Sequence, residues 1–415
     1  MRTSIDPGCG LVLAAAKILH DNGHDTSGTL VAADKITQRL GIAGRLVPEW
    51  GELFLLIDGF RLRAIESVPG NVNMKRVVAT LRIIDELDEG SLAAPEMAAA
   101  LNEAARALPS NAAVFVVACG FGAAALSIIN GATHVLALAI IALCAAAGGA
   151  LRQMIATLTS NTLMQVFAAS LLAGAVGAAG ISAHLSSSLR LIALGPLLVL
   201  VPGPAILGGM FDLVSIRIPL GASRVVFGLL TVLAITTGVL IGLDAGNQTL
   251  PPLVAPSSPP IWIDVLCAGV AAAAYSIFFT IPAQMLVYPV VMGMGAHAVR
   301  YWAMSHFELS NAAASGLACL FVGIVLVPIA RRLRLPFAAV GFASVVSMIP
   351  GIFLFRLGGG LLEITKSIGH SFQPALSGVV ADGATAFLTV VTMCLGLVLP
   401  KSLYDYLAQV RATRS

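Results

Sequence analysis

The chain has 415 residues, of which 58% are hydrophobic and only 11% are charged. Because ordinary soluble domains carry about 25% charged residues, this composition excludes a purely soluble protein and indicates one that spans a membrane. Residues 1–110 hold 11 basic and 14 acidic residues, a net charge of −3, whereas the remaining residues have a net charge of +6. We therefore expect a soluble domain over residues 1–110, followed by a membrane domain.

The soluble domain is predicted to be a small α+β domain. Apolar runs at 53–57 and 60–65 flank Asp58-Gly59, which is the strongest short-range signal for a hairpin. Helical spacing and turn residues predict four helices, over residues 8–20, 26–40, 74–89 and 94–108, the second capped by Thr26 or Ser27. The N-terminal segment has too short an apolar run for a signal peptide, so we expect this domain to stay in the cytoplasm.

A cluster of polar residues, His20, Asp21, His24 and Asp25, follows the first predicted helix. Two histidines four residues apart suit a metal ion if one helix carries both, but Asn22-Gly23 predicts a break between them. A capped helix end is therefore the favoured interpretation. The six cysteines form no CxxC pair, so we expect neither a disulfide framework nor a thiolate metal site. No metal and no cofactor is expected.

The membrane domain is predicted to contain ten spans. Apolar runs long enough to cross a bilayer fall near 111–129, 131–151, 162–184, 190–210, 222–243, 261–281, 283–302, 311–330, 336–356 and 377–399. A Pro- and Ser-rich stretch, 244–260, follows the fifth run. The expected fold is thus all-α in the membrane, with five spans in 111–243, a linker at 244–260, five spans in 261–400 and a cytoplasmic tail at 401–415.

The two halves repeat each other at an offset of 148 residues. Pro202-Gly203 corresponds to Pro350-Gly351, and Arg152 corresponds to Arg300, without a gap. Because each half has an odd number of spans, the second half must lie upside down relative to the first. This predicts the inverted repeats found in many secondary transporters.

The distribution of basic residues predicts the orientation. With the N-terminal domain inside, the inner loops and tail hold Arg152, Arg217, Arg224, Arg331, Arg332, Arg334, Lys401, Arg411 and Arg414. The outer side holds only Arg190, Arg300, Arg356 and Lys366. This asymmetry follows the positive-inside rule for a protein of the cell (inner) membrane. It places the linker outside the cell and the C-terminus in the cytoplasm.

The two Pro-Gly breaks are the predicted substrate site. A broken helix presents free N–H groups and the positive end of its dipole, which suit a carboxylate. We therefore expect Pro202-Gly203 and Pro350-Gly351 to approach each other near the membrane midplane and to bind a small carboxylate, with Arg152, Arg300 and Asn161 contributing. The alternatives are simple proline kinks for the breaks and a helix cap for Asn161.

Few ionisable residues lie near the spans, and each is a candidate for proton coupling. Asp212 and Asp382 flank the fourth and tenth spans, and His297 lies in the seventh. The alternative is that these side chains, several of which lie near predicted span ends, reach the interface instead.

The sequence resembles the threonine/serine exporter family in its fused form over nearly its whole length. The most specific matches are VPGPAILGGMFDL, ending near Asp212, and the second-half IPG at Pro350-Gly351. The resemblance implies export of threonine and serine driven by the proton-motive force. Some two-protein relatives are linked instead to dicarboxylates such as succinate, which is the alternative substrate class.

An enzyme inside the membrane is a less favoured hypothesis, since no HExxH, GxSxG or phosphate-cradling motif occurs. The expected partners are a small carboxylate substrate and the lipid bilayer, with no nucleic acid. The sequence leaves open whether the chain is a monomer or a homo-oligomer.

Overall fold

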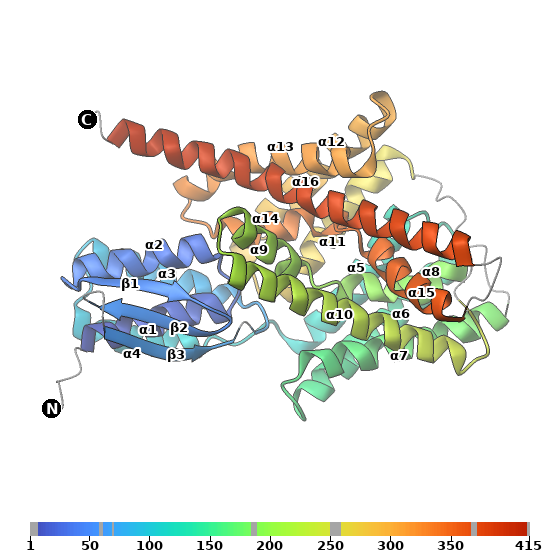
Figure 1. Cartoon of the computed structure of the whole chain (residues 1–415), viewed down its shortest axis with the longest axis horizontal. Helices are drawn as coiled ribbons and strands as arrows, with labels where there is room; N and C mark the ends of the chain where they lie inside the picture. Colours follow the sequence, from blue (N-terminus) through green and yellow to red (C-terminus); the bar gives the residue numbers. More distant parts are fainter. Residues whose placement is uncertain are drawn as a thin grey trace.

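The structure is a computed structural model that describes residues 7–57, 61–68, 70–183, 189–249, 259–366 and 372–412. Of these described residues 78% are helical, and they include one three-stranded sheet near the N-terminus. Figure 1 shows this sheet and the first four helices grouped at one end of an elongated bundle of apolar helices.

The N-terminal domain has the predicted α+β character. Its elements are α1 (Pro7–Asp21), α2 (Thr26–Arg39), β1 (Gly44–Pro48), β2 (Gly51–Ile57), β3 (Arg61–Ser67), α3 (Met74–Asp88) and α4 (Ala94–Ala105). The antiparallel pair β2–β3 confirms the predicted hairpin, whose turn lies outside the described residues. Strand β1 was not expected; it pairs with β2 and places Leu46 opposite Leu55, both buried under the helices.

Helix α2 begins with a different cap from the one predicted. The carboxylate of Asp25 accepts a hydrogen bond from the backbone N–H of Gly28 at 2.8 Å, so Asp25 is the N-cap and Thr26 is the first helical residue. Aspartate caps helices at least as well as serine or threonine. As a consequence, the hydroxyl groups of Thr26 and Ser27 are free to bond elsewhere.

The membrane domain contains shorter and longer helices in two consecutive sets. The first set is α5 (Ala112–Ile129), α6 (Val135–Ala156), α7 (Thr162–Ser182), α8 (Leu189–Leu194), η1 (Gly195–Leu200), α9 (Gly203–Val214) and α10 (Ile218–Asp244). The second set is α11 (Ile261–Phe278), η2 (Ala283–Met285), α12 (Val287–His306), α13 (Asn311–Arg332), α14 (Phe337–Val345), η3 (Val346–Met348), α15 (Gly351–Lys366) and α16 (Phe372–Ala412).

Seven of the described helices are long and apolar enough to cross a membrane, and two bent pairs raise the number to nine. The remaining segment that was expected to span is α12. It carries His297 and Arg300, and its mean hydropathy is too low for it to be counted among these helices. The count of ten spans therefore stays a prediction. Helix α16 also continues to Ala412, past the predicted start of the tail at residue 401, and it contains Pro400.

The two sets share the order and packing of their elements. Helices α9 and α15 begin 148 residues apart, at Gly203 and Gly351. Helix α7 packs on α10 as α13 packs on α16, and α9 packs on α10 as α15 packs on α16. The offset read from the sequence thus corresponds to equivalent structural elements.

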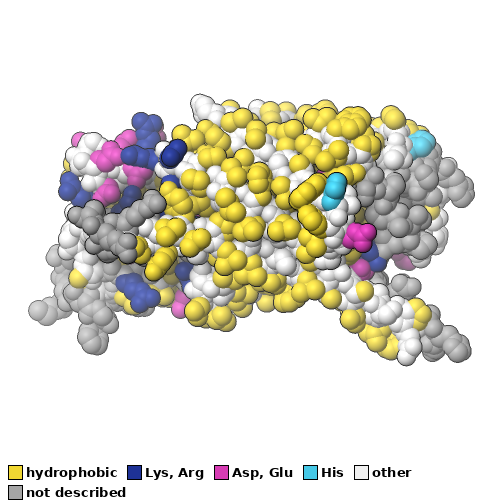
Figure 2. Space-filling view, turned by 90° about the horizontal axis from the view of Figure 1, so that it is seen from above, with side chains coloured by type: hydrophobic (Ala, Val, Ile, Leu, Met, Phe, Trp, Pro, Cys, Tyr) yellow, Lys and Arg dark blue, Asp and Glu magenta, His cyan; other side chains and the backbone are white. Residues whose placement is uncertain are grey.

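Apolar side chains cover the outside of the bundle. Phe121, Leu143, Ile324 and Phe387 are each at least 58% exposed. Figure 2 shows hydrophobic side chains across the middle of the molecule and charged ones gathered over the N-terminal domain. An exposed apolar surface of this extent is typical of contact with lipid.

Candidate functional site

The two Pro-Gly breaks lie directly against each other. A Cβ atom placed on Gly203 would come within 2.7 Å of Ile349 Cδ1, and one placed on Gly351 would come within 2.7 Å of Val201 Cγ2. Each glycine therefore faces the residue that precedes the proline of the other break. At these distances a side chain larger than hydrogen requires its neighbour to move, so glycine permits the close approach.

Both breaks have the same local backbone geometry. The N–H of Gly203 donates to the carbonyl of Val201 at 2.8 Å, and the N–H of Gly351 donates to the carbonyl of Ile349 at 2.7 Å. Pro202, with φ −78° and ψ 57°, has the geometry of an inverse γ-turn. The helical segments on either side of the breaks meet at 54° in the first half and 59° in the second. The predicted helix breaks are confirmed.

A first cavity, called the near cavity, lies on the side of this contact that faces the N-terminal domain. Its volume is about 370 Å³, and its lining includes Arg152, Gln165, Pro202, Tyr275 and Thr280. Asn73 and Arg76 of the N-terminal domain also line it. The phenol of Tyr275 donates to the carbonyl of Leu198 at 2.8 Å, which ties α11 to the segment before the first break.

A second cavity, called the far cavity, lies beside the second break. Its volume is about 70 Å³, and its lining includes Asn130, Arg300, Asn311, Ser347 and Pro350. Asn130 is the C-cap of α5, whose first residue, Ala112, follows directly on the N-terminal domain. The two cavities therefore lie toward opposite ends of α5, with the paired breaks between them.

Two arginines at equivalent positions of the repeat line the cavities, Arg152 the near one and Arg300 the far one, and the near cavity is lined by Arg76 of the N-terminal domain as well. The buried Nε atoms of Arg152 and Arg300 have no hydrogen-bond partner among the described residues. Arg152 lies over the ring of Phe115, 5.8 Å from its centroid, and the Nη2 of Arg300 donates to Asn311 at 2.7 Å. A buried guanidinium N–H without a protein partner suits a carboxylate ligand.

Asn161 and Asp382 lie outside both cavities and have other contacts. Asn161 is exposed and caps α7 by accepting a hydrogen bond from the N–H of Leu163 at 2.9 Å, which is the alternative role that the sequence left open. Asp382 is buried between α15 and α16, where it forms an ion pair with Arg356 at 3.0 Å. Arg152 lies with the first break in the near cavity, and Arg300 lies with the second break in the far cavity, whereas Asn161 and Asp382 line neither.

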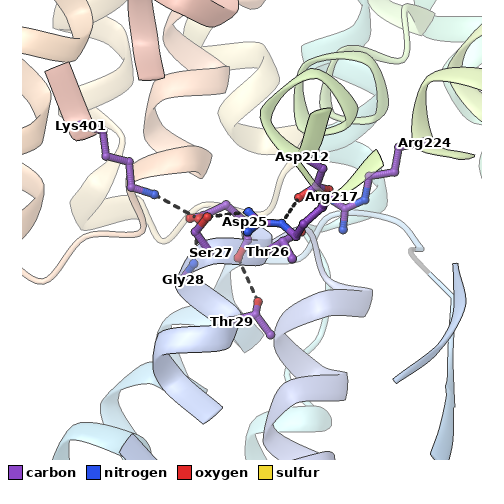
Figure 3. Close-up of polar contacts among 9 residues, drawn as sticks. All are labelled: Asp25, Thr26, Ser27, Gly28, Thr29, Asp212, Arg217, Arg224 and Lys401. Atoms are coloured by element: carbon purple, nitrogen blue, oxygen red, sulfur yellow. Dashed lines mark hydrogen bonds and ion pairs between the residues drawn. The ribbon is translucent and has the colours of Figure 1, made fainter. Parts of the chain in front are cut away.

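Asp212 lies at the junction of the N-terminal domain and the membrane domain. Its carboxylate forms ion pairs with Arg217 and Arg224, both at 3.0 Å, and accepts a hydrogen bond from Thr26 at 3.1 Å. Arg217 in turn donates to the hydroxyl of Ser27 at 2.6 Å. Figure 3 shows these residues converging on the start of α2. Since Asp212 is only 1% exposed, its visible role is to hold the two domains together.

His297 belongs to a buried polar trio that sequence reasoning found only in part. Its Nδ1 lies 2.9 Å from a carboxylate oxygen of Asp264, and its Nε2 lies 2.8 Å from the hydroxyl of Ser347. Asp264 resembles an ordinary acid at the start of a span, and Ser347 is one of many serines. The signal that could have found Asp264 is that it is the only acid in its apolar run.

Most of the chain matches models of one protein family. The ThrE model, which describes a threonine/serine exporter, matches residues 10–246. The ThrE_2 model, described as "Threonine/Serine exporter, ThrE", matches residues 264–403. The chain belongs to the threonine/serine exporter family. No solved structure matches it.

The two matched segments of this exporter-family chain divide at the predicted linker. The first segment covers the N-terminal domain and the helices up to α10, and the second covers the helices from α11 onward. Together with the apolar helices, membership of the family identifies a multi-pass membrane transport protein.

An ion pair between the two domains attaches the N-terminal domain of this exporter-family protein to its last helix, α16. Lys401 lies 3.1 Å from the carboxylate of Asp25 (Figure 3). Burial alone raises the pKa of Asp25, but Lys401, His24 and the N–H of Gly28 outweigh it and hold that pKa below its ordinary value. Asp25 therefore stays ionised and keeps both its cap and its ion pair.

His20 and His24 line a small cavity of about 100 Å³ at the same junction. Both are buried, and the Nε2 of His20 and the Nδ1 of His24 have no partner among the described residues. Within the described part of the chain no group of three or more His, Cys, Asp or Glu residues is placed to hold a metal ion. Burial lowers the pKa of both imidazoles below 6.5, so both are neutral at neutral pH.

Acidification is expected to loosen the N-terminal domain. As the pH falls below 6.5, His20 and His24 bind protons in the unfolded domain but not in the folded one, where both are buried. The free energy of unfolding therefore falls by up to about 1.4 kcal/mol per histidine per pH unit. Asp25 does not contribute above pH 5, because its own stabilisation is lost only below its ordinary value of 3.8. Hydrogen exchange of α1 and α2 in the full-length protein at pH 7.5 and 5.5 measures the effect.

The double variant His20→Gln/His24→Gln is the control for this pH effect. Without the two imidazoles, the difference in exchange between pH 7.5 and pH 5.5 should largely disappear. Stronger protection of α1 and α2 at pH 5.5 in the unmodified protein would contradict the assignment.

Proposed function

We propose that this chain exports threonine and serine across the cell (inner) membrane by exposing one site alternately to the near and the far cavity. The observation that carries the proposal is the reciprocal contact of the two Pro-Gly breaks between those cavities. In this state the near cavity is the larger, at about 370 Å³ against 70 Å³. A cavity of several hundred Å³ is in the usual range for a small-molecule site.

The proposal includes inverted repeats, and the directions of two helices support it. Helices α5 and α11 are equivalent in the repeat and pack against each other. The start of α5 lies beside the end of α11, because Ser110 bonds to the carbonyl of Ile277. Equivalent helices that run in opposite directions are what an inversion in the membrane plane requires.

The substrate is proposed to bind through its carboxylate. In the near cavity the unpaired Nε of Arg152 supplies a cationic donor, and the start of α9, whose Pro204 and Ala205 line the same cavity, supplies the positive end of a helix dipole. After the breaks rearrange, Arg300 and the half-helix that starts at Gly351 supply the equivalent groups on the far side. Of the two arginines that line the near cavity, Arg76 donates its Nε–H to the carbonyl of Ala107, which leaves the Nε of Arg152 as the unpaired donor for a single carboxylate.

The direction of export follows from the proposed orientation. We place the N-terminal domain and the C-terminus in the cytoplasm, so the near cavity takes substrate from the cytoplasm and the far cavity releases it outside. Uphill export requires an energy source, and the proton-motive force is the one proposed. The candidate proton-binding residues are Asp212, His297 and Asp382.

Transport by the purified protein in vesicles tests the proposal. Loaded vesicles should release threonine and serine faster than protein-free vesicles, an uncoupler should abolish uphill transport, and succinate should compete weakly. Arg152→Gln should raise the half-saturating threonine concentration at least tenfold, since a charged hydrogen bond to a carboxylate contributes about 1.5–3 kcal/mol. Exposed Arg106→Gln is the matched control. Unchanged release of all three compounds would refute the function.

A further inference from the structure

We propose that Asp264, His297 and Ser347 form the proton-binding site that couples export to proton entry. The three residues come from three separate elements, α11, α12 and η3, and meet through two hydrogen bonds of 2.9 and 2.8 Å. His297 is fully buried and Asp264 is 4% exposed, so the ring meets neither lipid nor bulk water directly. The inference rests on the proposed exporter function and identifies how its energy source acts.

The fold does not need this trio. The equivalent positions in the first half, 148 residues earlier, are Val116, Gly149 and Val199. There the helices pack closely without polar groups, and a Cβ atom on Gly149 would meet the sulfur of Cys119 at 2.8 Å. Burying an imidazole and a carboxylate inside a bundle costs more than burying apolar side chains. A polar trio in only one of two equivalent sites therefore points to a function that needs one copy.

The hydrogen-bond roles depend on whether the ring carries one proton or two. An ionised carboxylate can only accept, so the Nδ1 of His297 donates to Asp264. In neutral His297 the Nε2 then accepts, and the hydroxyl of Ser347 donates to it. When a proton binds Nε2, that nitrogen becomes a donor, and the Ser347 hydroxyl must turn its own hydrogen away from the ring. One proton bound by the ring thus reverses one hydrogen bond.

Ser347 connects this change to the breaks and to the far cavity. Its neighbour Val346 and the nearby Ile349 provide the atoms that lie closest to Gly203. Ser347 also lines the far cavity together with Arg300. When the hydroxyl of Ser347 turns its hydrogen, the change therefore affects both the contact between the breaks and the far cavity, where substrate would leave.

The charges around the ring give the sign of the coupling. Asp264 from α11 and Arg300 from α12 are the charged groups that act on His297. The polar group from η3 is Ser347, and the thiol of Cys267 lies near Asp264 on α11. With neutral His297, the oxygen of Ser347 can accept from the ammonium group of an amino acid. With protonated His297, a second positive charge joins Arg300 and repels that ammonium group.

Proton binding from the outside therefore favours release of substrate to the outside. The return of the protonated site and loss of its proton to the cytoplasm complete the cycle, so that one proton enters for each amino acid that leaves. This is antiport, in the direction that export requires.

Purified protein in vesicles tests the site with two measurements. One is threonine accumulation driven by a pH gradient, and the other is threonine–threonine exchange without a gradient at pH 5.5 to 8. In His297→Gln, gradient-driven accumulation is expected to fall by a factor at least tenfold larger than the factor by which exchange falls. Acidic pH should inhibit exchange by the unmodified protein but not exchange by this variant. Ser347→Ala should lower accumulation at least fivefold. His306→Gln, on the same helix but exposed, is the control that should behave like the unmodified protein.

Three results would decide against the proposal in different ways. If His297→Gln keeps gradient-driven accumulation with an unchanged pH profile, the proton binds elsewhere. If His297→Gln and Ser347→Ala both lose accumulation and exchange to the same extent, the trio has only a structural role. If the unmodified protein itself shows no threonine exchange, the proposed function fails, and the result does not concern the trio alone.

Discussion

Gly203→Leu and Gly351→Leu are each expected to reduce export at least tenfold. Their Cβ atoms would lie 2.7 Å from Ile349 and Val201, closer than carbon atoms approach in proteins, and a leucine adds three further carbons. Overpacking of this kind costs about 1–3 kcal/mol of stability. Export should suffer more than stability, because the same surfaces must separate and meet again in every transport cycle. Vesicle transport and thermal unfolding of the same samples separate the two effects.

Gly378→Leu is the matched control for these variants. Gly378 also lies in a long apolar helix, but nothing comes within 4 Å of the position of its Cβ atom. This variant should transport and unfold like the unmodified protein. Near-normal export by Gly203→Leu would show that the breaks do not move against each other.

A pair of smaller substitutions tests the contact itself. Gly203→Ala alone should lower export, and Ile349→Ala removes the methyl group that an added Cβ would strike. The double variant is therefore expected to export better than Gly203→Ala, with a coupling free energy of about 1 kcal/mol. Strictly additive effects would place the two residues in separate functions.

The sequence predicted the breaks and their pairing because both depend on local chemistry. Proline removes a helical hydrogen bond and glycine permits close approach wherever they occur, and an offset of 148 residues relates the two copies. The hairpin of β2 and β3 was predictable for the same reason. Strand β1 was not, since the short segment Gly44–Pro48 becomes a strand only through pairing with β2.

The junction and the buried trio could not be predicted, because they depend on contacts between distant parts of the chain. Asp212 meets Thr26, which lies 186 residues earlier, and Ser347 meets His297 across 50 residues. Each of these residues has an ordinary explanation in its own segment. Only the folded chain shows that a span-end acid joins two domains and that a serine faces a histidine.

Asp212→Asn is expected to weaken the attachment of the N-terminal domain to the membrane domain at the start of α2, where Thr26 and Ser27 contact Asp212 and Arg217. The ion pair between Asp25 and Lys401 remains. The change removes the charge that faces Arg217 and Arg224, and Arg224 is only 8% exposed. Breaking a buried ion pair by removing one partner costs about 3–5 kcal/mol, because the remaining charge stays buried without compensation. Hydrogen exchange of α2 and limited proteolysis near Ser110 should both increase several-fold. Asp34→Asn, which changes an exposed acid on α2, should have little effect.

The same substitution should change transport through the near cavity. Asn73 and Arg76 of the N-terminal domain form part of its wall, so weaker attachment of the domain opens the cavity to the cytoplasm. We expect the half-saturating concentration of threonine to rise several-fold, while the inhibition of exchange at acidic pH, which depends on His297 beyond the breaks, stays the same. A variant that weakens the attachment and keeps its affinity for threonine would show that the N-terminal domain only covers the cavity. Loss of the pH effect as well would mean that the junction, and not only the trio around His297, takes part in proton coupling.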